Sequence, residues 1–169
     1  MQDIAALKEF LVRTPFFGGL DDAALERLIA MLALRSYPAG AAVFRAGDTG
    51  TSMFIVQSGE LVGRQSGGGR DVKMMRFRSG DFFGETTLIE MQPRPITVIA
   101  EAPAILLELT GANLYKLYKE DVRGYVMVLQ NINRELCRRL RRAVGRISEI
   151  AQDSDDDVTQ IGQEIPTRR

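Results

Sequence analysis

The chain has 169 residues, which is enough for one domain with a full hydrophobic core and an appended helix or tail, but not for two domains of ordinary size. Its 22 basic residues balance its 22 acidic ones, which excludes a bulk electrostatic attraction to nucleic acid or to membranes. A single cysteine excludes an internal disulfide, and no histidine is present to act as general base or metal ligand.

The first 34 residues are predicted to be helical. Ile4, Leu7 and Leu11 repeat at helical spacing, and Pro15 ends the pattern because the residue before a proline disfavours the helical conformation. Asp21 is a predicted N-cap for a second helix through Leu25 and onward. The start of the chain lacks the basic region of a signal peptide and no apolar run is long enough for a membrane span, so we expect a cytoplasmic protein.

Residues 35–109 have a different pattern, in which short apolar runs are separated by Gly, Asp and Ser. Runs of this length with such punctuation are typical of antiparallel strands. The predicted strands lie at 42–46, 53–57, 61–65, 72–77, 97–101 and 104–109. The expected fold class is therefore α+β, mainly β: an antiparallel double-stranded β-helix or jelly-roll, flanked by N-terminal helices and a long C-terminal helix.

The third region, 110–152, returns to helix. Thr110 is a possible cap, and the stretch from 122 to 150 contains no proline. An a/d seam runs along it through Val126, Leu129, Asn133, Leu136, Leu140, Ala143, Ile147 and Ile150. This seam predicts a homodimer of parallel helices with Asn133 fixing the register; the alternative is packing of the seam on the chain's own barrel. Cys137 is expected to be a buried or half-buried thiol on this helix.

Arginines crowd the same helix between 138 and 146. They are interpreted as a solvated flank, as a second contact to a ligand phosphate, or as a site for an acidic partner. Residues 153–169 are polar and have no sustained periodicity, so they are predicted to be a disordered acidic and polar tail.

The stretch from Gly80 to Thr97 carries the most specific chemistry. Gly84 permits a positive φ and a close approach of backbone to a ligand. Arg94 offers a planar, permanently charged fork for a phosphate, and the ionised Glu85 is an acceptor suited to a hydroxyl such as a ribose 2′-OH. This combination favours a small anion that also carries sugar hydroxyls.

The motifs in this stretch are Phe83-Gly84-Glu85, Leu88-Ile89, Pro93-Arg94 and Thr97-Val98. Together they resemble the phosphate-binding cassette of cyclic nucleotide-binding domains, the family of the catabolite activator proteins and the protein kinase A regulatory subunits. The turns and strands at 37–48 and 53–60 are also similar to that family. The resemblance implies one domain over 1–152, with helices at 1–34, a β-roll at 35–109 that holds the cassette at 80–97, and C-terminal helices at 110–152.

The resemblance also implies which residues form the site. Glu85 would hold the ribose 2′-OH, while Arg94 and nearby amides hold the cyclic phosphate. The full predicted ligand-binding set is Gly84, Glu85, Thr86, Thr87, Arg94, Thr97 and Arg139. No metal or further cofactor is expected beside the ligand, cAMP or cGMP. Arg94→Ala is expected to abolish phosphate binding and to leave the fold intact.

The function that follows is a stand-alone regulatory sensor. It would bind cAMP or cGMP and signal through its C-terminal helix to a partner protein, as a homodimer through 122–150. Too few residues follow that helix for a helix-turn-helix module, so no DNA contact is expected, and no membrane contact. An enzyme is not expected, because the chain offers no nucleophile and base pair and no metal cluster.

Departures from the family pattern support an alternative. Pro95 follows Arg94 and cannot donate a hydrogen bond to a phosphate, and the long helix has Ala143 and Val144 where the catabolite activators use hydroxyls to read adenine. The alternative is a degenerate dimeric scaffold or interaction subunit without a mononucleotide ligand, or one that binds a cyclic dinucleotide.

Overall fold

The computed structural model describes residues 4–67 and 70–163. It divides the chain into two compact units, Met1–Asn131 and Ile132–Arg169. The first unit contains every strand of the described chain, and within the described residues the second is a single length of helix. Among the described residues, no helix combines the length and the apolar character needed to cross a lipid bilayer.

The chain begins with two α-helices joined by a short 3-10 turn. These elements are α1 (Ile4–Val12), η1 (Pro15–Phe17) and α2 (Asp22–Met31). The predicted cap of α2 is confirmed, because the Asp21 carboxylate accepts a hydrogen bond of 2.8 Å from the backbone N–H of Ala24. The connector between the helices buries Phe16 and Phe17, so it belongs to the core and anchors the helices.

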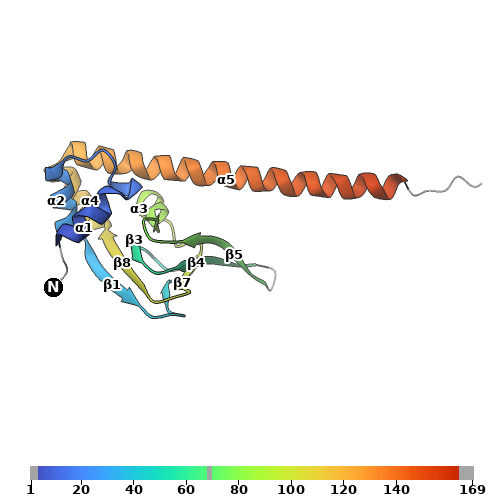
Figure 1. Cartoon of the computed structure of the whole chain (residues 1–169), viewed down its shortest axis with the longest axis horizontal. Coiled ribbons are helices and arrows are strands. Elements are labelled where there is room, and N and C mark those ends of the chain that lie inside the picture. Colours follow the sequence, from blue (N-terminus) through green and yellow to red (C-terminus); the bar gives the residue numbers. More distant parts are fainter. Residues whose placement is uncertain (1–3, 68–69, 164–169) are drawn as a thin grey trace, which may run out of the picture. The chain divides into compact units, whose positions relative to one another are not determined.

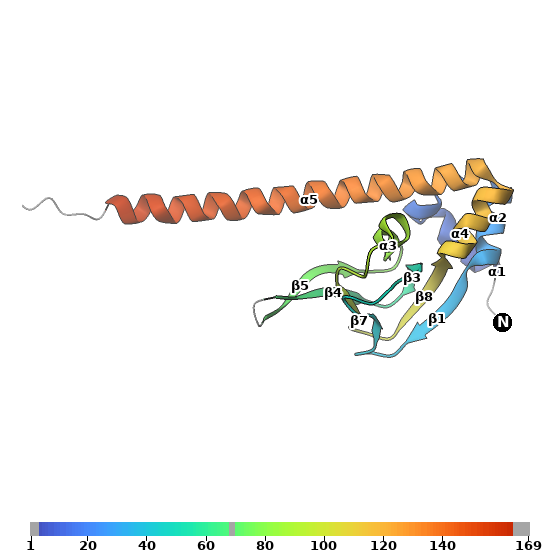
Figure 2. The ribbon, with the colours of Figure 1, turned by 180° about the vertical axis from the view of Figure 1, so that it is seen from behind.

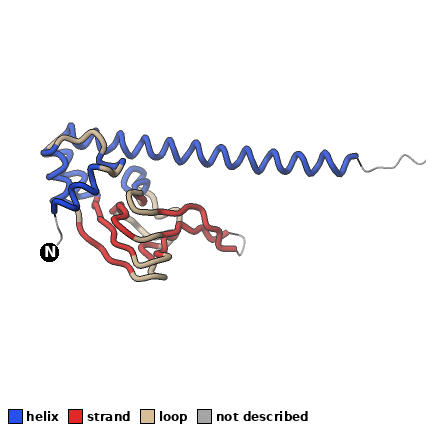
Figure 3. The backbone as a smooth tube through the Cα atoms, in the orientation of Figure 1, coloured by secondary structure: helices blue, strands red, loops and turns tan. Residues whose placement is uncertain are grey.

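The strands form two antiparallel four-stranded sheets, which are red in Figure 3. One sheet has the order β1-β8-β3-β6 and the other β2-β7-β4-β5. Their bounds are β1 Ala33–Tyr37, β2 Ala42–Phe44, β3 Ser52–Ser58, β4 Leu61–Gly67, β5 Arg70–Phe77, β6 Phe82–Phe83, β7 Thr97–Ala100 and β8 Ala104–Thr110. The predicted jelly-roll is confirmed, since consecutive strands alternate between the two sheets, apart from β4 and β5, which pair with each other within one sheet.

Two predicted boundaries in this region are wrong. The helical region was expected to reach residue 34, but α2 ends at Met31 and Ala33 already pairs with Glu108 of β8. Strand β2 was expected to reach Ala46, but it ends at Phe44 because Asp48 closes a turn onto the backbone N–H of Arg45 at 2.7 Å. In both places a tertiary pairing or a side-chain bond overrides the local pattern.

The inner faces of the two sheets form a dry core. Phe54, Phe83 and Leu106 are at most 5% exposed, and the Phe54 and Phe83 rings stack with their centroids 5.6 Å apart. Helices α1, α2 and α4 (Gly111–Glu120) gather at one end of β1 and β8 (Figure 1; seen from behind in Figure 2). The cassette between β6 and β7 lies beside this helical end, since a Cβ added at Gly111 would lie 3.3 Å from Cδ2 of Leu88.

The chain ends in α4 (Gly111–Glu120) and α5 (Val122–Gln163). Thr110 caps α4 as predicted, accepting a hydrogen bond of 3.1 Å from the Asn113 N–H. The predicted end of the last helix near residue 152 is wrong, because its helical backbone continues to Gln163 with no proline to stop it. Residues 164–169 of the predicted tail lie outside the described residues, and Cys137 is exposed, not buried or half-buried as expected.

Candidate functional site

The cassette opens at a glycine that no other residue can replace. Gly84 has φ +82° and precedes α3 (Glu85–Glu90), a helix of six residues. A Cβ at this position would lie 2.6 Å from Nη1 of Arg94 and 3.3 Å from the carbonyl oxygen of Ser52. Both the left-handed backbone and the lack of space therefore require glycine here.

Arg94 is the centre of the cassette. Its residue is only 4% exposed, although it carries a permanent charge. Nη1 donates to the carbonyl oxygen of Gly84 at 2.9 Å and to the hydroxyl of Thr87 at 3.4 Å, and Nη2 donates to the carbonyl oxygen of Ser52 at 2.6 Å. The guanidinium thus joins the start of α3 to the start of β3.

Phe44 and Gly50 also lie against the same guanidinium. The ring centroid of Phe44 lies 4.1 Å from the central carbon of Arg94, a cation–π contact. On the Gly50 side the approach is closer still, since a Cβ added at Gly50 would lie 2.2 Å from Nε and 2.4 Å from the central carbon. The Arg94 side chain is therefore held in one position before any ligand arrives.

The electrostatics of Arg94 combine burial with nearby carboxylates. Burial lowers the pKa of the Arg94 guanidinium, and the charges of Asp48, Glu85 and Glu108 act in the opposite direction. The guanidinium stays protonated, because an arginine pKa begins far above neutral pH. Within the described part of the chain, the buried Nε of Arg94 has no hydrogen-bond partner. An uncompensated donor on a buried charge is costly, and an anion would satisfy it.

The structure brings together four of the seven predicted ligand residues. Gly84, Glu85, Thr87 and Arg94 form one buried or half-buried cluster, in which Glu85 is 1% and Thr87 4% exposed. Thr86 lies between them on α3 and is half-buried.

The other two predicted residues have different surroundings. The hydroxyl of Thr97 accepts a hydrogen bond of 3.0 Å from the backbone N–H of Ala46, so it stabilises the turn that follows β2. Arg139 belongs to the second unit, where its guanidinium donates to the Glu135 carboxylate at 3.2 Å. Its predicted contact with a ligand stays a prediction.

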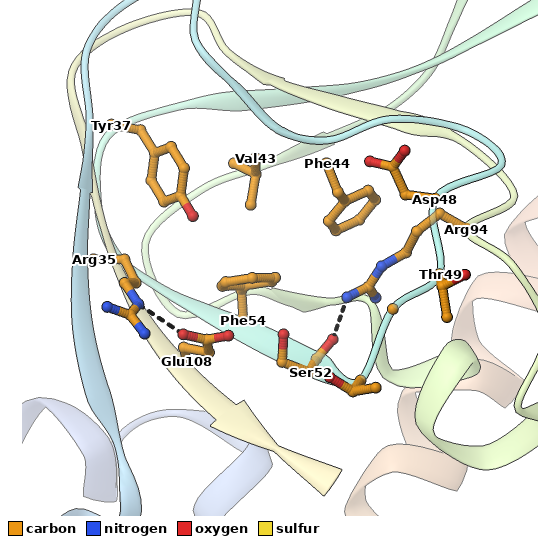
Figure 4. Close-up of a pocket in the computed structure, with 12 residues that line it drawn as sticks. Arg35, Tyr37, Val43, Phe44, Asp48, Thr49, Ser52, Phe54, Arg94 and Glu108 are labelled. Carbon is orange, nitrogen blue, oxygen red and sulfur yellow. Dashed lines mark hydrogen bonds and ion pairs between the residues drawn. The ribbon is translucent and has the colours of Figure 1, made fainter.

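A pocket of about 380 Å³ lies next to Arg94 (Figure 4). Its polar wall includes the ion pair between Arg35 and Glu108, whose atoms are 2.7 Å apart, and the Arg94 guanidinium points toward Ser52 at its edge. Its apolar wall consists of Tyr37, Val43, Phe44 and Phe54. Arg94 is the one member of the predicted ligand set that lines this pocket. Its side chain therefore contacts both the pocket and the cassette.

Sequence reasoning missed the residues that hold Arg94 in place. Phe44 and Gly50 lie 50 and 44 residues before Arg94 in sequence, so no local spacing connects them to it. The partner on Ser52 is a backbone carbonyl, which has no signal in the sequence at all. The one available hint was Gly50, a glycine in the turn between β2 and β3.

The comparisons with known proteins agree with this geometry. The family model described as cyclic nucleotide-binding domain matches residues 34–121. The cAMP-dependent protein kinase regulatory subunit of Mycosarcoma maydis is 33% identical over 96 residues, which are 57% of this chain and 18% of the relative.

Solved structures give the same result. The Thermus thermophilus catabolite activator protein superposes with a TM-score of 0.72 at 26% identity, over 82% of this chain and 63% of the other. The c-di-GMP responsive global regulator CLP of Xanthomonas campestris gives 0.69 at 26% identity, over 88% and 73%. The chain spans less than two thirds of the length of its first curated relatives. The match of the family model over residues 34–121 shows that this chain belongs to the cyclic nucleotide-binding domain family.

Proposed function

We propose that this chain is a regulatory module that binds cAMP or cGMP at the cassette and signals through α5 to a partner protein. The observation that carries the proposal is the buried Nε of Arg94, which has no hydrogen-bond partner among the described residues while the rest of the side chain is fixed. A cyclic phosphate supplies an anionic acceptor for it, and the charge-assisted bond is of the strong kind.

Glu85 supports the sugar side of the proposal. Its carboxylate lies in the same cluster as Arg94 and is 1% exposed. A phosphate beside an ionised carboxylate is repelled, whereas a ribose hydroxyl donates to it. A ligand with both groups therefore fits the pair better than inorganic phosphate does.

The contacts of Arg94 also provide a route from ligand to regulation. One guanidinium joins Gly84 before α3, Ser52 in β3 and Phe44 in β2. A phosphate that draws this group toward itself must change at least one of these contacts, which shifts the balance between two arrangements of the cassette. Transmission of that shift to α5 and to a partner protein is part of the proposal.

A scaffold without a mononucleotide ligand is the second candidate, and Pro95 favours it. Pro95 is exposed next to Arg94 and lacks an N–H, so one donor to a phosphate is absent. A loss of this kind weakens binding by about 1 to 3 kcal/mol, or roughly ten- to a hundredfold. The name of the Xanthomonas regulator makes a cyclic dinucleotide the natural third ligand to test.

The second unit supports self-association as part of the same proposal. Its helix exposes apolar side chains at Leu140, Val144, Ile147 and Ile150. We infer that two copies pair through this helix, because the exposed Leu140, Ile147 and Ile150 belong to the predicted a/d seam.

Thermal unfolding with cAMP, cGMP or cyclic di-GMP tests the ligand. A ligand at 100 times its Kd stabilises by about 2.7 kcal/mol, which raises the Tm of a chain this size by roughly 5 to 10 °C. We expect a rise with one mononucleotide that is lost in Glu85→Gln and in Arg94→Lys. Arg35→Gln is the matched control, because it removes a guanidinium from the pocket without touching the cassette.

The shift caused by ligand must be compared within each variant, because Arg94 also supports the fold. The Arg94 side chain has three hydrogen bonds and is 4% exposed, so we expect Arg94→Ala to lower the stability of the fold as well as to remove the phosphate contact. An equal Tm rise in wild type, Glu85→Gln and Arg94→Lys contradicts the site. No rise with any of the three ligands favours the scaffold.

A further inference from the structure

The second unit has an apolar stripe that nothing in that unit covers. Leu140, Val144, Ile147 and Ile150 are 65%, 54%, 66% and 66% exposed, and this unit consists of one helix within the described residues. A helix with one apolar face is stable in water chiefly when that face packs against another element.

The stripe has the spacing of a coiled coil over three heptads. Steps of four and three residues lead from Leu140 to Val144, Ile147 and Ala151, with Ile150 next to Ala151 on the flank of this seam. The same alternation continues in the sequence through positions 154, 158 and 161. The helical backbone extends over this whole range. A second helix with the same spacing is therefore the shape that fits the stripe.

The charges along this helix are divided into two blocks of opposite sign. Between 134 and 146 the sequence has six arginines and one acidic residue, Glu135. Between 147 and 163 it has five acidic residues and no basic one. A parallel pair would place arginine block against arginine block, while an antiparallel pair places each arginine block against an acidic block.

We propose that two copies of this chain pair through residues 135–163 as an antiparallel coiled coil. The proposal rests on the self-association put forward above, and it replaces the parallel arrangement that the seam alone predicts. The stripe is then covered by a second copy of the same helix. The acidic block of that copy lies against the arginine block of the first.

Heptad packing fixes the register of such a pair. Matching a with d positions in opposite directions sets Leu140 against position 158 of the second copy and Ile147 against position 151, with the centre at Glu149. The flanking positions then set Arg141 against position 155, an aspartate in the sequence. The paired segment begins at 135, after the first unit ends at Asn131, and spans about 42 Å.

Salt dependence is the first test, measured by sedimentation at about 50 and 500 mM salt. Opposite charges are screened by salt, so an antiparallel dimer should dissociate several-fold more readily at high salt. A parallel dimer brings like charges together, so it should become tighter. A dimer that tightens with salt overturns the proposed orientation.

Cys137 is a built-in reporter of orientation, because it is the one cysteine in the sequence and is exposed. In the antiparallel register two Cys137 residues are 24 positions apart, or about 36 Å, far beyond disulfide reach. Wild type should not crosslink on oxidation, and Ile161→Cys should crosslink to Cys137 of the other copy. A Cys137 to Cys137 disulfide overturns the orientation.

A charge swap tests the register. Arg141→Glu should weaken the dimer at low salt at least several-fold, and adding Asp155→Arg should restore it, because these positions face each other only in the antiparallel pair. Arg76→Glu makes the same charge change in the first unit and should have no effect on association. Failure of the second change to restore pairing contradicts the register.

These outcomes are separate from ligand binding. A monomer under all conditions overturns both self-association and its orientation, while the Tm response to cyclic nucleotides still decides the ligand. A dimer without any nucleotide response leaves the antiparallel pair intact and overturns the sensor.

Discussion

The two units of this chain differ in how far their hydrophobic residues are exposed to solvent. In the first, Leu106, Leu107 and Val98 are at most 1% exposed between and behind two sheets. In the second, Leu140 and Ile147 are about two thirds exposed on a lone helix. The first unit encloses its core within one chain, whereas the second has the pattern of a core that needs another surface.

The largest difference between the units is expected in the unfolding free energy that is lost when an arginine is replaced by alanine. Arg94→Ala leaves the buried carbonyls of Gly84 and Ser52 without their donor, so we expect a loss of about 2 to 5 kcal/mol in unfolding free energy. Arg142→Ala removes a side chain that is 65% exposed and 3.9 Å from Glu135, and should change stability by at most about 0.5 kcal/mol. Urea unfolding followed by circular dichroism measures both, and equal losses would contradict the contrast.

A pair of core-type substitutions sharpens the same contrast. Leu106→Ala creates a cavity at a residue with 0% exposure and should cost about 2 to 5 kcal/mol. Ile147→Ala should leave the unfolding of the first unit unchanged and instead weaken self-association, because its side chain is 66% exposed. Urea unfolding and sedimentation of the two variants separate these effects. A loss of unfolding free energy in monomeric Ile147→Ala would show that the apolar side chains of the second unit are already covered within one chain.

Two glycines should respond with opposite signs. Gly50→Ala drives a Cβ into the Arg94 guanidinium, which the carbonyl bonds hold in place, so we expect a loss of about 1 to 3 kcal/mol and a weaker ligand response. Gly145→Ala has no atom within 4 Å of the new Cβ and lies inside a helix, so it should stabilise that helix by about 0.5 to 1 kcal/mol. Thermal melts of both variants, without ligand, check the signs.

The smallest expected effect is a pH dependence of the second unit. Burial alone would raise the pKa of the Glu135 carboxyl, but bonds and charges from Arg138 and Arg139 lower it below its ordinary value of 4.5. Its stabilising contribution is therefore complete above pH 4.5 and is lost as the pH falls through the lowered pKa. It should amount to a few tenths of a kcal/mol for helical pairs of this kind.

Circular dichroism between neutral pH and pH 3 tests this effect. Wild type should lose helicity that Glu135→Gln has already lost at neutral pH, so the two curves should converge in acid. Parallel curves that stay separate would mean that Glu135 is not the group responsible.

Most of the first unit could be predicted from the sequence, because its local signals agree with its fold. The Asp21 and Thr110 caps were found from residue type and spacing, and the glycine punctuation located six of the eight strands in the described part of the chain. The short β6 strand at Phe82–Phe83 was missed, because two residues carry no periodicity and the strand exists through its pairing with β3.

The candidate site was predictable only in part. Gly84, Glu85 and Arg94 follow from a motif of residues close together in sequence. The cover of Arg94 by Phe44 and Gly50 and its bond to the Ser52 carbonyl depend on how β2 and β3 meet the cassette. For that reason the structural role of Arg94, and the loss of stability expected in Arg94→Ala, became visible only in three dimensions.

The sequence by itself determined the strand and helix pattern, the cassette motif and the two charge blocks of α5, because these depend on residue type and spacing along the chain. Tertiary structure alone decided where α2 gives way to β1, that Arg94 is a buried tie between strands, and that the stripe of the second unit is uncovered. The physical reason is the same in each case: burial and backbone pairing are set by residues distant in sequence, which no local pattern records.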